Sequence, residues 1–189
     1  MIRIRRLTLI FLILIISCAT TTMQSVWKDN NYSSQIKKIF IIGVSQNNTI
    51  RQQFEDEFVK QLATREIEAI PSYSILSADK MLDKDTIVSK IKDMNIDGVI
   101  VTKLINKPGL SLPEKAMTYH THYVESVQVT SRNRASQDYI MLETNLYDTK
   151  TEKLVWSGVS ERFLFRSTSE AIKPFIEVMI QSLYIDNMI

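Results

Sequence analysis

The sequence predicts a protein of the α/β (α+β) class, in which a βαβαβ unit is followed by antiparallel strands and a C-terminal helix. Two continuous apolar runs, Lys38–Val44 and Asp97–Ile105, are typical of strands that are buried on both faces. Segments with helical spacing lie between them, whereas residues from 117 onward alternate between apolar and polar. This combination favours a mixed sheet with helices packed on it in two or three layers.

The first half of the chain contains the parallel part of the predicted sheet. A helix is expected over residues 50–65, capped by Asn48 or Thr49, because Phe54 and Phe58 recur at helical spacing. A strand at 67–70 and a helix at 84–94 then lead to the apolar run at 97–105. The outer face of the first helix is expected to carry its charged side chains: Arg51, Glu55, Asp56, Glu57 and Lys60. Strands and helices at this spacing indicate right-handed crossovers.

The second half predicts antiparallel strands. Residues 117–130 form one long, half-exposed strand, and residues 131–137 form a polar hairpin loop before a returning strand at 139–147. A further strand is expected over 154–165, followed by a helix over 171–184. The residues of that helix expected to face the sheet are Ile172, Phe175, Ile176, Met179 and Leu183.

The N-terminus has the pattern of a secretory signal. Three arginines precede an apolar run, Leu7–Ile16, which is about 15 Å long as a helix and too short for a bilayer core of about 30 Å. The following Ile15–Cys18 resembles the bacterial lipobox, which implies that Cys18 is lipidated. The alternative is an uncleaved anchor with an incidental cysteine. The lipobox reading predicts a signal peptide over 1–17, a flexible tether over 18–36 and a single periplasmic domain over 37–189.

Removal of the leader changes the charge of the chain. The full sequence has 23 Lys and Arg against 21 Asp and Glu, and three arginines belong to the leader, so the mature part has 20 against 21. A formal charge of −1 gives no support for nucleic-acid binding. Cys18 is the only cysteine, so its acylation leaves no thiol for disulfides, metal ligation or catalysis. No Gly-rich phosphate motif is present and no cofactor is expected.

Two places in the chain could bind a ligand. The loop Ser45–Asn48 follows a strand and precedes a helix, where a parallel sheet presents ligands. His120 and His122 share one face of their predicted strand and could contact the same metal, but no other histidine exists in the chain. Two solvated histidines are therefore the better interpretation, and no metal is assigned.

The predicted hairpin is the surface expected to bind a partner, because tyrosines and arginines are exposed on it. An acidic partner could meet the arginines, although a solvated hairpin tip explains them as well. The residues assigned to this surface are Tyr119, Tyr123, Arg132, Arg134 and Tyr139.

Several segments resemble a family of uncharacterised bacterial outer-membrane lipoproteins. They are Lys-Ile-Phe-Ile-Ile-Gly-Val-Ser from residue 38, Phe-Glu-Asp-Glu-Phe-Val-Lys-Gln-Leu from residue 54, Ala-Ile-Pro-Ser-Tyr from residue 69, and residues 143–158 with their Asp-led turn and Val-Trp. The resemblance covers roughly residues 23–186 and carries no catalytic residue. Glycine is more common in that family where Glu66 and Glu152 stand, and both positions are in turns.

The predicted order of elements is also similar to small periplasmic domains: the TolB amino-terminal region, the curli-secretion lipoprotein and the lipoprotein activator of penicillin-binding proteins. By analogy, this implies a non-catalytic binding or assembly module that is anchored through Cys18 in the outer membrane, faces the periplasm and binds an envelope protein. One alternative is a metal-dependent envelope hydrolase that uses His120 and His122. Another is a subunit of an oligomeric outer-membrane secretion assembly. The sequence leaves the oligomeric state open.

Overall fold

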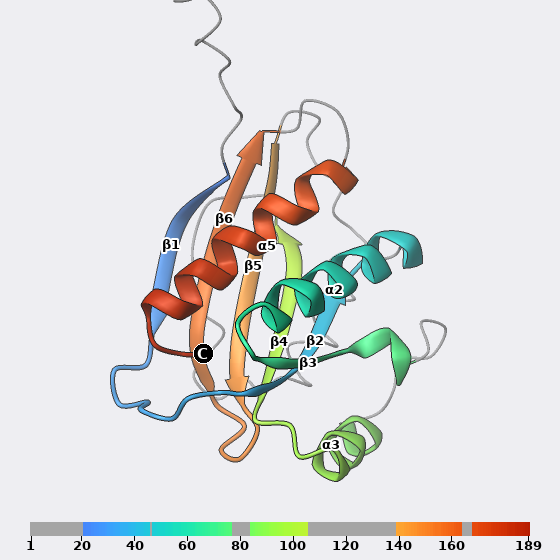
Figure 1. Ribbon diagram of the computed structural model, residues 1–189, viewed down its shortest axis with the longest axis vertical. Helices are drawn as coiled ribbons and strands as arrows, with labels where there is room; N and C mark the ends of the chain where they lie inside the picture. The colour runs from blue at the N-terminus through green and yellow to red at the C-terminus, as the bar shows by residue number, and fades with distance from the viewer. Residues whose placement is uncertain (1–20, 46, 77–83, 106–138, 164–167) are drawn as a thin grey trace, which may run out of the picture.

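The computed structural model describes residues 21–45, 47–76, 84–105, 139–163 and 168–189, which form one mixed sheet with helices on it (Figure 1). The elements are β1 (Thr22–Lys28), β2 (Lys38–Val44), α2 (Asn48–Ala63), β3 (Glu68–Pro71), the 3₁₀ turn η1 (Ser72–Ser74), α3 (Lys84–Asp93), β4 (Gly98–Ile105), β5 (Tyr139–Asp148), β6 (Leu154–Phe163) and α5 (Thr168–Ile185). The predicted α/β class with a C-terminal helix is confirmed. None of the helices in these ranges is long and apolar enough to cross a membrane.

The six described strands lie in the order β1-β6-β5-β4-β2-β3. β2 is parallel to both β3 and β4, as the alternation of strands and helices predicts. The pairs β4–β5, β5–β6 and β6–β1 are antiparallel. The sheet therefore has a parallel half and an antiparallel half, which meet at β4.

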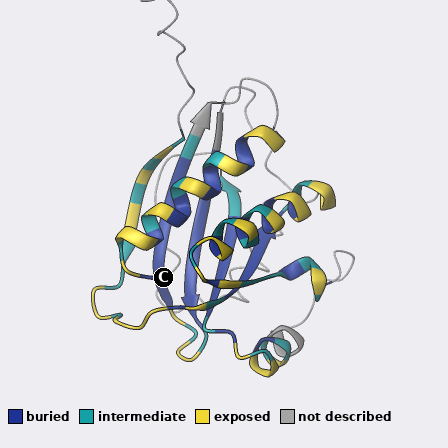
Figure 2. Cartoon of the chain, in the orientation of Figure 1, coloured by how far each residue is buried: buried dark blue, intermediate teal, exposed yellow. Residues whose placement is uncertain are grey.

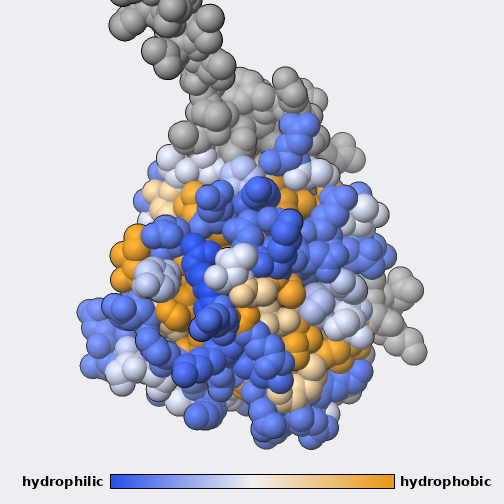
Figure 3. All heavy atoms as spheres, in the orientation of Figure 1, coloured by the Kyte–Doolittle hydropathy of each residue, from blue (hydrophilic) through white to orange (hydrophobic). Residues whose placement is uncertain are grey.

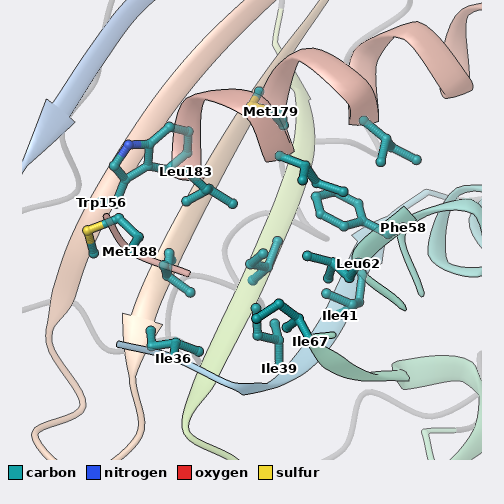
Figure 4. Packing of buried hydrophobic residues seen from close by; sticks show 14 of the residues in the cluster. Ile36, Ile39, Ile41, Phe58, Leu62, Ile67, Trp156, Met179, Leu183 and Met188 are labelled. Atoms are coloured by element: carbon teal, nitrogen blue, oxygen red, sulfur yellow. The ribbon is translucent and has the colours of Figure 1, made fainter. Parts of the chain in front are cut away.

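The described helices cover both faces of the sheet, so the domain has three layers. α2 and α5 lie side by side on one face, where they bury Ile39 and Ile41 of β2 (Figures 1 and 4). The alternate residues Phe40 and Ile42 point to the other face and pack with Ile91 of α3. Figure 2 shows the central strands buried along their length between these layers. The prediction that the two apolar runs are buried on both faces is confirmed.

The structure corrects the predicted start of α2. Its N-cap is Asn47, whose side-chain oxygen accepts hydrogen bonds from the backbone N–H groups of Thr49 (3.0 Å) and Ile50 (3.2 Å). Asn48 and Thr49, the two expected caps, already lie within the helix. A cap residue needs an extended backbone outside the helix, and Asn47 has it, with φ −90° and ψ 107°.

The expected flexible tether over 18–36 is also corrected, because the chain is part of the domain from Thr22 onward. β1 pairs with β6, and Trp27 packs against the apolar cluster on the α3 side of the sheet. Ile36, just before β2, is only 1% exposed. Edge pairing with β6 supplies backbone hydrogen bonds to a segment whose own apolar pattern is too weak to predict a strand.

The predicted hairpin between residues 117–130 and 139–147 conflicts with the observed sheet. Both edges of β5 are occupied over Met141–Tyr147, one by β4 and the other by β6. A strand at 117–130 therefore has no place beside this part of β5. Residues 106–138 themselves lie outside the described residues.

Glu66 and Glu152 both have positive φ, at 61° and 57°. A left-handed backbone costs an ordinary residue energy that glycine does not pay. This explains why glycine is more common at these two turn positions in the family that the sequence resembles.

Tyr32 is expected to make stability depend on alkaline pH. Its hydroxyl donates to Asp148 Oδ2 (3.1 Å), and burial, followed by the charge of Asp148, raises the pKa of Tyr32 well above its usual value. An unfolded tyrosine ionises near pH 10, so this stabilisation is complete below about pH 10 and is lost as pH rises toward the raised pKa. Urea unfolding between about pH 9 and 11 should show a steeper loss for the wild type than for Tyr32→Phe. Parallel curves would contradict this expectation.

Candidate functional site

An apolar cavity of about 150 Å³ lies at the carboxyl ends of β2 and β4, between the first turns of α2 and α5. Its lining is mostly apolar: Val44, Ile50, Phe54, Leu104, Leu142, Ala171, Ile172 and Phe175, with Gly43, Ser45, Arg51, Thr102 and Lys103. A cavity of this size holds a benzene-sized group. It therefore fits one apolar side chain better than an extended small molecule.

The position of the cavity follows from the topology. Parallel strands present ligands beyond their carboxyl ends, and the loop after β2 was singled out on that ground. Ser45 of that loop lines the cavity, whereas Asn47 serves as the cap of α2. Part of the apolar wall comes from α5 and β5, which the sequence could not place beside this loop.

A buried ion pair lies next to the cavity, on the first turns of α2. Arg51 is 5% exposed and Glu55 is fully buried, and Arg51 Nε donates to Glu55 Oε1 (3.0 Å). The same carboxylate oxygen accepts from the backbone N–H of Gly43 (2.9 Å) and from Ser72 Oγ (2.7 Å). The second oxygen, Oε2, accepts from the backbone N–H of Tyr73 (2.9 Å). The pair thus joins α2 to the end of β2 and to η1.

This network corrects the expectation that Arg51 and Glu55 lie on a solvated face of the helix. Each Glu55 oxygen already accepts hydrogen bonds, and Arg51 Nη2 donates to Ser72 Oγ (2.6 Å). A carboxylate satisfied in this way stabilises the wall of the cavity and is poorly suited to proton transfer. We assign the pair a structural role.

A second buried charged group lies on β4 and β5. Lys103 Nζ is 3.3 Å from Glu143 Oε1, and the Glu143 side chain is 2% exposed. The same oxygen accepts a hydrogen bond from Asn145 Nδ2 (2.8 Å). By strand alternation, Glu143 and Asn145 point to the face opposite α2 and α5, so their side chains do not line the cavity, although Lys103 is one of its lining residues.

The residues that the sequence assigned to a partner-binding hairpin are not brought to the cavity by any described contact. Tyr139 is the first residue of β5 and lies opposite Phe163 of β6. The others lie outside the described residues: Tyr119, Tyr123, Arg132 and Arg134, together with His120, His122 and Cys18. Within the described ranges, no three His, Cys, Asp or Glu side chains gather as a metal site would require.

These features define a three-layer α/β domain with a small apolar cavity at one end of its sheet. No protein-family model matches the sequence, and a search of curated proteins gives no match. Among solved structures, the chain is similar to the PelC dodecamer from Paraburkholderia phytofirmans, with 11% identity, a TM-score of 0.47 and coverage of 86% of this chain and 96% of that one. It is also similar to lipoprotein GNA1162 from Neisseria meningitidis, with 12% identity, a TM-score of 0.42 and coverage of 78% and 98%.

Proposed function

We propose that this protein is a lipid-anchored, non-catalytic binding module of the bacterial envelope. In this proposal Cys18 carries the lipid, the domain faces the periplasm from the outer membrane, and the ligand is another envelope protein. The observation that carries the proposal is the apolar cavity, which can receive one apolar side chain of that protein.

The residues around the cavity support binding rather than catalysis. Arg51 and Glu55 are engaged with each other, and Thr102 Oγ1 is 2.9 Å from Thr144 Oγ1 across the β4–β5 pair. The remaining walls are mainly apolar. Burial of apolar surface contributes roughly 25 cal/mol per Å², so one inserted side chain supplies useful affinity without any reaction.

The short link between the anchor and the domain supports a position close to the membrane. Cys18 is only four residues before Thr22, the first residue of β1, and four extended residues span about 14 Å. By register, Met23 lies opposite Ser160 of β6, which lies opposite Leu142 of the cavity. The cavity and the start of β1 are therefore at the same end of the sheet.

Filling the cavity is expected to weaken partner binding while the fold is retained. Ala171 is 2% exposed and lines the cavity, so Ala171→Leu adds apolar atoms where a partner side chain would insert. A photo-crosslinker at Ser45, at the rim, would capture the partner in intact cells. We expect the crosslinked species to fall at least about tenfold in Ala171→Leu, equivalent to about 1.4 kcal/mol of binding free energy.

The matched control is Ala63→Leu, which adds the same atoms at an exposed position of α2 and should leave the crosslink unchanged. An equal crosslink in both variants would exclude the cavity as the binding site. Arg132→Glu with Arg134→Glu tests in the same assay whether these two arginines contribute to partner binding. Mass spectrometry of the natural protein tests the anchor separately, since a free Cys18 thiol and an intact leader would exclude a lipid anchor.

A further inference from the structure

We propose that the outer edge of β1 is a dimerisation surface, on which β1 of a second copy of this chain pairs in antiparallel orientation. The proposal does not depend on the lipid anchor or on the cavity. It comes from the difference between the two ends of the described sheet and from the exposed apolar residues beside one of them.

The two edge strands of the described sheet differ in how they are protected. β3 has four residues and ends at Pro71, and its Glu68 forms an ion pair with Lys38 (2.8 Å). Shortness, proline and charge are the usual protections of an edge against further pairing. β1 has seven residues, with a bulge between Met23 and Ser25 and a single charged residue, Lys28. From Ser25 to Trp27 it therefore presents a regular, uncharged edge.

The large hydrophobic residues exposed in the described part of the chain gather at this edge. They are Val26 at 42%, Tyr184 at 59% and Ile185 at 66% exposure. Val26 lies opposite Gly158, which has no side chain to cover it. Apolar surface is visible beside β1 and the end of α5 in Figure 3.

Contacts through Asp186 hold the end of α5 beside β1. Lys28 Nζ donates to the backbone oxygen of Asp186 (2.5 Å), and Trp156 Nε1 donates to Asp186 Oδ2 (2.6 Å). Tyr184 and Ile185 directly precede Asp186, so they belong to the end of α5 that Lys28 contacts. The exposed apolar residues at the end of α5 therefore lie near the Lys28 end of the edge strand.

A second copy of the chain fits this surface because an antiparallel edge is complementary to itself. A two-fold axis through Val26 places Val26 opposite Val26 of the partner subunit, so both side chains lose water contact. It places Lys28 opposite a glutamine, Gln24 of the partner subunit, so no like charges face each other. Cyclic dimers of this isologous kind are the commonest oligomers of soluble proteins. The expected product is one sheet that continues across two copies.

The test is the mass of the purified full-length mature protein in detergent, measured by native mass spectrometry over a concentration series. We expect a dimer. Val26→Lys should raise its dissociation constant at least about tenfold, because it places two ammonium groups opposite each other at the two-fold axis. The matched control, Gln52→Lys on the exposed surface of α2, should leave the dimer intact. Circular dichroism establishes that both variants are folded.

A disulfide crosslink between two copies tests the predicted register, in which residue 26 of one copy lies opposite residue 26 of the other. Val26→Cys should form an intermolecular disulfide under mild oxidation, whereas Gln52→Cys should not, and the wild type reports any contribution of Cys18. Ile185→Lys changes a side chain that is mostly exposed, so it weakens the dimer without risk to the fold. A monomer at all concentrations, a dimer that survives Val26→Lys, or a larger closed assembly would each overturn the proposal.

Discussion

Replacing Glu55 with glutamine is expected to lower the free energy of unfolding by about 3–5 kcal/mol. The substitution leaves Arg51 buried without its counter-ion, next to Ser72 and the cavity. In the wild type, the carboxylate accepts hydrogen bonds from the backbone N–H groups of Gly43 and Tyr73. The glutamine amide has only one acceptor oxygen, which is uncharged, so at least one of these N–H groups faces an NH₂ group instead. Urea unfolding followed by far-ultraviolet circular dichroism measures the loss.

Glu57→Gln is the matched control, on the same helix and with the same change of charge. Glu57 Oε2 is 3.9 Å from Lys60 Nζ, whose side chain is 76% exposed, so this pair contributes at most about 1 kcal/mol. Arg51→Met combined with Glu55→Gln should cost less than the sum of the two single changes, because it removes the unpaired buried charge. Equal losses for Glu55→Gln and Glu57→Gln would show that the buried network contributes little.

The same network shows what a helical pattern can and cannot predict. Phe54 and Phe58 correctly predicted the face of α2 that packs on the sheet. Arg51 and Glu55 were assigned to the opposite face because they are charged, although their spacing from the two phenylalanines puts them on the buried one. The charge of these two side chains was therefore a poorer guide to their burial than their spacing along the helix. The partners that allow burial, at Gly43 and η1, come from outside the helix and leave no local signal.

The strands that are buried on both faces were predictable, and the edge strand β3 was predicted as well, but the edge strand β1 was missed. β2 and β4 are continuous apolar runs, which only a central position in a sheet explains. β1 has the mixed composition of an edge strand, and its pairing with β6 joins residues more than 120 positions apart. The cavity also depends on residues that are far apart in the sequence, because α2, α5, β4 and β5 each supply part of its lining. Only the loop after β2, which follows a general rule of parallel sheets, could be located from the sequence.

Replacing Trp156 with alanine is expected to cost about 3–5 kcal/mol of stability. Trp156 is fully buried on the α5 side of β6, within the cluster shown in Figure 4, and a side chain at Gly158 would collide with its ring. Alanine leaves a cavity beneath α5 and also removes the hydrogen bond to Asp186 Oδ2 (2.6 Å). The measurement is urea unfolding followed by circular dichroism, so that loss of the fluorophore does not affect it.

Two further variants separate packing from hydrogen bonding at this position. Trp156→Phe keeps an aromatic ring but removes the N–H donor, so it should cost about 1.5–3 kcal/mol, the range for hydrogen bonds to charged groups. Trp27, the other tryptophan, is only partly buried, and Trp27→Ala should cost clearly less than Trp156→Ala. Because Trp156 Nε1 donates to Asp186, loss of Trp156 should loosen the end of α5 beside β1 and speed amide exchange at residues 183–188, even though Lys28 still donates to the backbone oxygen of Asp186. Unchanged exchange there would show that Lys28 and the packing of Leu183 hold this turn without Trp156.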